Sequence, residues 1–150
     1  MNTEAQKKTP RGVRNNNPLN IVRSKSAWQG QKQVITDKRF CEFESMAYGW
    51  RAAFYLLTKT YYHRYGLSSI QTIIARWAPK EENDVDAYVS TVSKLMNYDP
   101  NISLGVPLMH PTRWLALGLA MAYVENGVYA FDYFEMLKGW EMLYGNSHYD

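Results

Sequence analysis

The spacing of apolar residues changes near residue 45 of the chain. From Asn20 to Glu44 the apolar residues form short groups separated by turn residues such as Gly30, and this pattern predicts a small antiparallel sheet of two or three strands. After Ser45 the apolar residues recur at three- and four-residue spacing, as on amphipathic helices. The sequence therefore predicts an α+β fold that is mainly α.

The helical part predicts five helices. The first, over residues 46–65, follows the N-cap candidate Ser45 and ends before Gly66. The second follows Ser68-Ser69 and ends at Ala78-Pro79. The others are expected after Asn83 as N-cap up to about Asn97, from Pro111 to about 126, and over about 130–143, with a loop over 100–110.

The fourth of these helices should be the central one. It has no charged residue from Trp114 to Val124, and a helix that is apolar on all sides is normally buried. Its apolar run is shorter than the roughly 20 residues that a bilayer span needs. We therefore expect no membrane span, and we expect Trp114, Leu117, Met121 and Val124 in the core.

Length and composition favour one domain. With 150 residues, 46% of them hydrophobic, the chain can bury one core. We expect a disordered or extended basic N-terminus over residues 1–12, a single domain over 13–145 and a tail over 146–150. The basic start is not followed by a continuous apolar run, so no signal peptide is expected. A chain made in the cytoplasm would need a virion or export machinery to reach the periplasm or cell wall.

Cysteine, histidine and charge content narrow the chemistry further. One Cys and three dispersed His do not predict an internal disulfide or a structural zinc site, and no metal or cofactor is expected. The net charge is +3, and Lys and Arg are scattered rather than clustered. Nothing in this pattern predicts a nucleic-acid partner.

An asparagine-rich segment near the N-terminus is the first candidate site. Residues 14–21 read RNNNPLNI, and Trp28-Gln29-Gly30 follows. Asparagine offers a donor and an acceptor and tolerates left-handed backbone, so this segment with an exposed Trp28 would suit a carbohydrate-binding edge. The alternative is a cluster of turns that leads into a hairpin.

Glu125 is the candidate acid. Helical spacing places Met121, Gly118 and Trp114 on its face, so its side chain should leave an apolar stripe where the buried helix ends. Partial desolvation and the negative end of the helix dipole both oppose ionisation, as a general acid for glycosidic bond cleavage requires. The alternative is a solvated glutamate paired with Lys138 or Arg113.

Two other groups of acids are weaker candidates. Residues 81–86 contain four acids that could hold a cation or act as a base, but acids are also common in first helical turns. Tyr88 lies one turn beyond Asp84 and is an open candidate for a groove-facing hydroxyl. Glu42 alternates with Phe43 in a predicted strand and is expected on the solvent face.

Several motifs together resemble a known family. Four motifs are similar to those of a family of phage and prophage virion-associated proteins. They are RGVRNNNPLNI, WQGQ, D-x-x-F-x-x-F-x-S-x-x-x-G-x-R-A over Asp37 to Ala52, and RWAP-x-x-END up to Asp84. The resemblance extends from Arg11 to Tyr88. Members typically carry Asn-Asn-Pro-Gly-Asn-Ile, and this chain has Leu19 in place of that glycine.

A weaker similarity connects the chain with cell-wall enzymes. The Asn motif with its Trp-x-Gly resembles a stretch of bacterial cell-wall glucosaminidases, and Ala122 to Gly127 resembles the Ala-x-x-Glu-Ser-Gly motif that carries the acid in lysozyme-like lytic transglycosylases. In those families the Glu helix precedes the Asn motif. The reversed order here would fit a circularly permuted domain.

These resemblances imply a lysozyme-like fold and cleavage of peptidoglycan glycan strands by a muramidase or lytic transglycosylase. Glu125 would be the single general acid, and the residues that would bind the glycan are Asn17, Asn20, Trp28 and Tyr88. The alternative is a non-catalytic virion or mobile-element structural protein, or a glycan-binding module on the same fold. Partners beyond peptidoglycan would then be virion or secretion-apparatus proteins.

Overall fold

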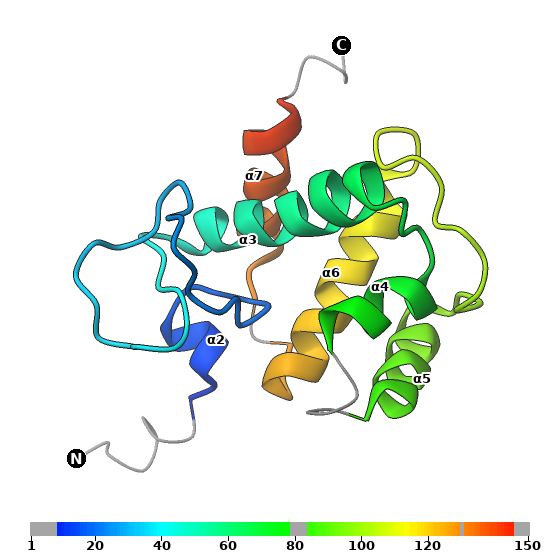
Figure 1. Cartoon of the computed structure of the whole chain (residues 1–150), viewed down its shortest axis with the longest axis horizontal. Helices are drawn as coiled ribbons and strands as arrows, with labels where there is room; N and C mark the ends of the chain where they lie inside the picture. Colours follow the sequence, from blue (N-terminus) through cyan, green and yellow to red (C-terminus); the bar gives the residue numbers. More distant parts are fainter. Residues whose placement is uncertain (1–8, 79–83, 130, 146–150) are drawn as a thin grey trace.

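The computed structural model of the chain describes residues 9–78, 84–129 and 131–145. The described part is mainly helical, which confirms the α-rich class (Figure 1). Its helices are α2 Arg11–Arg14, α3 Met46–Phe54, the π-helix η1 Tyr55–Arg64, α4 Ile70–Trp77, α5 Val85–Met96, α6 Pro111–Asn126 and α7 Tyr133–Tyr144. Among the described residues, no helix combines the length and apolar content that crossing a membrane requires.

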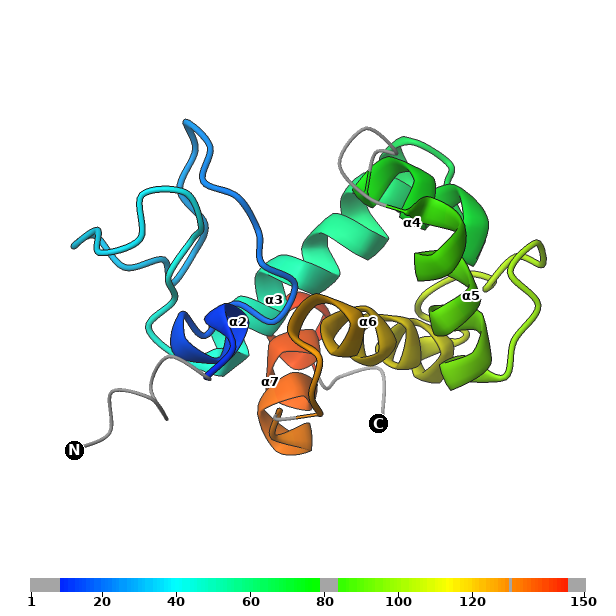
Figure 2. The same cartoon turned by 90° about the horizontal axis from the view of Figure 1, so that it is seen from below.

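The sheet expected over residues 20–44 is not formed. The described residues contain only two isolated antiparallel bridges in this segment, Val22 with Phe40 and Gln31 with Phe43, and Figure 2 shows the segment as irregular loops beside the helices. The Cys41 N–H donates to the Ile21 carbonyl and the Arg23 N–H donates to the Arg39 carbonyl, but side chains also bind the backbone here. The Asn17 amide nitrogen, for example, donates to the carbonyls of Ile21 and Cys41, and side-chain bonds of this kind compete with a continuing ladder.

Helix α6 lies at the centre of the described structure, with α7 on one side and α4 and α5 on the other (Figure 1). Trp114, Leu117 and Met121 are fully buried, which confirms three of the four expected core positions. Val124 packs against the core but is only partly buried. Around α6, aromatic rings of α3 and α7 interlock, with Phe54 edge-on to Trp140 at 5.2 Å between centroids. The buried centre therefore fixes the end of α6 that carries Glu125.

Most of the expected helix boundaries are confirmed. The Ser45 hydroxyl accepts from the Tyr48 backbone N–H, and Ser69 forms a capping box with Thr72. Gly127 ends α6 with φ 74°, the left-handed conformation expected of a C-terminal glycine. The cap of α5 is Asp84, whose carboxylate accepts from the Ala87 N–H. It replaces the expected Asn83, which lies outside the described residues.

The long helix expected over residues 46–65 is continuous, but its second half is a different type of helix. From Tyr55 to Arg64 it is a π-helix, in which the backbone bonds span one residue more than in an α-helix. Helical periodicity predicts a rod without predicting this wider turn. Tyr61, near the end of η1, is buried against the core and reaches the cleft described below.

Two smaller expectations need correction. Arg11 and Gly12, assigned to a disordered or extended N-terminus, belong to the short helix α2; residues 1–8 and 146–150 lie outside the described residues. Glu42, expected on a solvent face, is only 4% exposed. Its carboxylate accepts from the Thr36 hydroxyl and backbone N–H and pairs with Arg23 at 3.0 Å. The loop therefore folds around a buried acid instead of exposing it.

Candidate active site

Glu125 lies in the last turn of α6 at the edge of a cleft of about 580 Å³. The chain segments that form the cleft are distant in sequence: the loop after α2, the π-helix η1, the end of α4 and the end of α6. The lining residues are Asn20, Ile21, Val22, Arg39, Phe40, Tyr61, Trp77, Ala78 and Glu125. The Asn motif and the end of the buried helix thus share one cleft.

Two neutral donors hold one oxygen of Glu125. The Trp77 indole N–H donates to Oε2 at 3.1 Å, and the Tyr88 hydroxyl donates to the same oxygen at 2.9 Å. Among the described residues, the other oxygen, Oε1, has only a long contact of 3.5 Å with the Asn20 amide nitrogen. The carboxylate is therefore oriented by α4 and α5, while Oε1 is the oxygen less engaged by the protein.

The cations considered as partners of Glu125 lie elsewhere. Lys138 pairs with Glu135 on α7 at 3.3 Å, and Arg113 donates to the Leu104 carbonyl. In the described part of the chain, no ion pair involves Glu125 within 4.0 Å. The described surroundings thus orient this carboxyl group with neutral donors.

Tyr88 faces the acid instead of the open cleft. Its side chain is 6% exposed, and it is not among the residues that line the cleft. Burial raises the pKa of the Tyr88 hydroxyl far above its ordinary value, and the adjacent negative charge of Glu125 and the hydrogen bond to it raise this pKa further. Tyr88 consequently stays protonated and acts as a fixed donor, which corrects the expectation of a groove-facing hydroxyl.

Asn126, which sequence reasoning did not select, joins the Asn motif to α6. Its amide oxygen accepts from the Gly12 N–H at 3.0 Å, and its amide nitrogen donates to the Pro18 carbonyl at 2.9 Å. A Cβ on Gly12 would lie 2.4 Å from that amide oxygen and 2.7 Å from the Asn17 carbonyl oxygen, so this approach requires glycine. The available signal was its position directly after the candidate acid.

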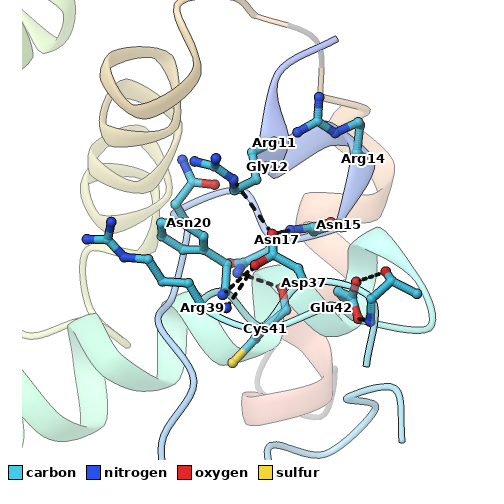
Figure 3. Close-up of polar contacts among 12 residues, drawn as sticks. Arg11, Gly12, Arg14, Asn15, Asn17, Asn20, Asp37, Arg39, Cys41 and Glu42 are labelled. Carbon is cyan, nitrogen blue, oxygen red and sulfur yellow. Dashed lines mark hydrogen bonds and ion pairs between the residues drawn. The ribbon is translucent and has the colours of Figure 1, made fainter. Parts of the chain in front are cut away.

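Asn20 reaches the acid, whereas Asn17 does not. Asn20 has φ 53° and lines the cleft beside Glu125, and its amide oxygen is buried with no hydrogen-bond partner among the described residues. Asn17 is fully buried: its amide nitrogen donates to the Ile21 and Cys41 carbonyls, and its oxygen accepts from the Ile21 N–H (Figure 3). The expectation that Asn17 lies on a glycan-binding surface is therefore wrong; it holds the loop together.

Leu19 does not disturb this turn. The left-handed residues are Asn16 and Asn20, both with φ 53°, so the position between them needs no glycine. Leu19 is fully buried in the core. The leucine in place of the usual glycine thus adds an apolar anchor beneath the Asn motif.

Trp28 is not brought to the cleft. It packs edge-on against Tyr55, with centroids 5.5 Å apart, and lines a separate hollow. The aromatic residues among the described lining of the cleft are Phe40, Tyr61 and Trp77, and none of the three was predicted as a site residue. Trp77 lies in the RWAP motif, so a signal was present, but the motif contributed only to the family resemblance and Trp77 was interpreted only as a helix residue.

The acidic segment before α5 gives no second acid in the described structure. Asp84 caps α5, and residues 81–83 lie outside the described residues. Within the described ranges, no group of three or more His, Cys, Asp or Glu side chains is placed to hold a metal ion. Glu125 is the one carboxylate among the described residues that line the cleft.

Comparison with known proteins places the chain among phage proteins. Protein P5 of Pseudoalteromonas phage PM2 is 40% identical over 134 residues, which cover 87% of this chain and 80% of the phage protein. The chain belongs to the Protein P5 family. No protein family model matches it. Membership of the Protein P5 family supports the phage part of the resemblance found in the sequence.

Proposed function

We propose that this protein cleaves the glycan strands of peptidoglycan, as a muramidase or lytic transglycosylase on a lysozyme-like fold, with Glu125 as general acid. The observation that carries the proposal is the Glu125 carboxyl group, oriented by Trp77 and Tyr88 at the edge of a cleft. Such an acid, fixed in a cleft that an extended strand can enter, is what protonation of a glycosidic oxygen requires.

The hydrogen bonds around Glu125 assign its two oxygens different tasks. Oε2 accepts two donors, which occupy the lone pairs available to it. The acidic proton therefore belongs on Oε1 and passes from there to the glycosidic oxygen as the bond from that oxygen to the sugar carbon breaks. Trp77 and Tyr88 are positioning residues in this scheme, because they act on the substrate only through Glu125.

The single carboxylate favours transglycosylation over hydrolysis. Hydrolases of either stereochemistry ordinarily use two carboxylates, and the described lining of the cleft holds only Glu125. In a transglycosylase, a hydroxyl of the same strand attacks the oxocarbenium-like carbon and closes a ring. That hydroxyl returns its proton to the Glu125 carboxylate, so the acid is restored and no water is consumed.

The Glu125→Gln variant tests this proposal. Glutamine keeps the volume of the side chain but cannot donate an acidic proton, so release of soluble muropeptides from purified sacculi should fall by about 100- to 10,000-fold. Glu135→Gln, which changes a carboxylate that pairs with Lys138 on α7, is the matched control and should retain activity. Anhydro ends on the products would identify transglycosylation, and new reducing ends hydrolysis. Equal activity of wild type and Glu125→Gln would remove Glu125 from the chemistry.

The second candidate is a non-catalytic role as a virion structural protein or glycan-binding module. Membership of a family that includes a phage protein favours it, because function resides in the site and not in the fold. In this case the wild-type protein binds sacculi and releases nothing. Under both candidates we propose that the chain is made in the cytoplasm and carried to the cell wall by a virion or export machinery.

A further inference from the structure

We propose that the groove formed by the cleft and a second hollow beside it selects glycan strands that carry carboxylate groups. Arginines on both sides of Glu125 would bind these carboxylates. This inference rests on the proposed function and specifies its substrate. Neutral strands such as chitin would fit the same groove without these contacts.

The groove continues past Glu125 on both sides. A second hollow, of about 320 Å³, shares Asn20 and Glu125 with the main cleft. Arg39 lines the main cleft, and Arg11 and Arg14 line the second hollow. Among the described lining residues of both hollows, Glu125 is the only acid. A strand lying across Glu125 would therefore meet positive charge in both directions.

Two of these arginines are held by the same aromatic ring. The guanidinium of Arg11 lies 4.6 Å from the centroid of the Phe40 ring, and that of Arg39 lies 5.0 Å from it. Asp37 fixes the same corner, because its carboxylate accepts from the backbone N–H groups of Arg39 and Phe40. Cation–π contacts restrict the flexible side chains, so these charges lie at defined places along the groove.

Two of the three arginine charges are available to a ligand. Asp37 lies 3.6 Å from Arg11 and balances its charge. Arg14 donates to a backbone carbonyl. In the part of the chain that the structure describes, neither Arg39 nor Arg14 has a carboxylate within 4.0 Å. Both are exposed and line different hollows, and Figure 3 shows their side chains extending in different directions.

A carboxylate is the ligand group that this arrangement suits. The planar guanidinium offers parallel N–H donors that match the two oxygens of a carboxylate. Peptidoglycan strands carry carboxylates on their stem peptides, or on the lactyl group once the peptide is removed. Because Arg39 and Arg14 are exposed, each contact should strengthen binding modestly and should weaken with salt.

Binding, rather than turnover, is the suitable measurement. The Glu125→Gln variant is used throughout, so that strands are not consumed, and three soluble ligands of equal length are compared: native peptidoglycan strands, the same strands with their carboxylates converted to amides, and chitin oligosaccharides. Native strands should bind most tightly, and their advantage should shrink between about 0.05 and about 0.5 M NaCl. Strands freed of peptide by an amidase keep only the lactyl carboxylate, so their affinity assigns the contact to the lactyl group or to the stem peptide.

Substitutions connect the preference to the groove. Arg39→Gln and Arg14→Gln, each added to the Glu125→Gln background, should lower affinity for native strands by about two- to fivefold, the scale of exposed ion pairs, and should leave chitin binding unchanged. Arg64→Gln is the control, because Arg64 is also exposed and also lies over an aromatic ring, that of Tyr65. It lines neither hollow and should change nothing.

The outcomes separate this inference from the proposed function. Equal binding of native and amidated strands would overturn the inference, even if the wild-type protein cleaves sacculi. Equal binding of polyglutamate and native strands would also overturn it, since that result means attraction without glycan recognition. A preference for native strands that Arg39→Gln and Arg14→Gln weaken would support the inference, even if the wild-type protein releases no muropeptides and the proposed cleavage fails.

Discussion

The Tyr88→Phe substitution should show how much the orientation of the Glu125 carboxyl group contributes to catalysis while Glu125 itself is kept. The substitution removes one hydroxyl, which donates to Oε2 of Glu125 at 2.9 Å, and leaves the ring in a position that is 6% exposed. Because phenylalanine fills nearly the same volume, the core beneath α5 should stay packed. Trp77 still donates to the same oxygen, so the carboxylate keeps one of its two supports.

The size of the effect follows from this contact. A hydrogen bond to a charged group contributes about 1.5–3 kcal/mol, and the remaining Trp77 bond limits the loss to the lower part of that range. A loss of about 1.4 kcal/mol in transition-state stabilisation corresponds to about tenfold in rate. We therefore expect kcat for muropeptide release to fall by about tenfold with little change in KM, since Tyr88 does not line the cleft.

A double-mutant cycle with Glu125→Gln supplies the decisive comparison. If Tyr88 acts through Glu125, adding Tyr88→Phe to Glu125→Gln should cost much less than tenfold, because interacting residues are not additive. Thermal melts of both single variants provide the control for folding. A full tenfold loss in the Glu125→Gln background, or an unchanged kcat in Tyr88→Phe alone, would refute the positioning role.

Three further predictions concern stability. Gly12→Ala should lower the free energy of unfolding by about 1–3 kcal/mol in chemical denaturation, because its Cβ would lie 2.4 Å from the Asn126 amide oxygen. An unchanged midpoint would show that the contact between Gly12 and Asn126 can rearrange at no cost in stability. Trp114→Ala should cost about 3–5 kcal/mol in a thermal melt, and a wild-type midpoint would mean that α6 is not central. Burial opposes ionisation of Glu42, but hydrogen bonds from Thr36 and the charge of Arg23 outweigh it and hold its pKa below the ordinary 4.5. The stability that this lowered pKa adds is present above pH 4.5 and is lost as the pH falls through the lower folded-state pKa. The loss of unfolding free energy in Glu42→Gln at pH 7 should therefore become smaller in acid. A loss that does not depend on pH would contradict the assignment.

The helical half of the fold could be predicted from the sequence because its signals are local. Ser45, Ser69 and Gly127 occupy positions at which they cap helices, and the uncharged run of α6 predicted its burial. The segment over residues 20–44 could not be predicted in this way. Its apolar spacing suits strands, but the long-range bonds of Asn17 and the buried Glu42 decide its shape, and spacing along the chain does not reveal such bonds.

The candidate site was predictable in part. The apolar face behind Glu125 identified the acid, and the motif resemblance identified Asn20; the two lie in contact. The sequence did not show that Trp77 and Tyr88 share one carboxylate oxygen, because that depends on how α4 and α5 pack against α6. Asn17 was misassigned for a related reason: an asparagine that folds a loop and one that meets a ligand have the same local neighbours.

In the described structure, three side chains form hydrogen bonds with the Glu125 carboxylate, and they are 105, 48 and 37 residues away from it in sequence. Each of them is synthesised before Glu125, and none can orient the acid until the chain has been made through α6 and α6 has packed against α5. Contacts of such long sequence separation form late, after loop closure has been overcome. A stalled or truncated nascent chain that lacks α6 would therefore contain Arg11, Arg14 and Arg39, which line the two hollows, but not Glu125.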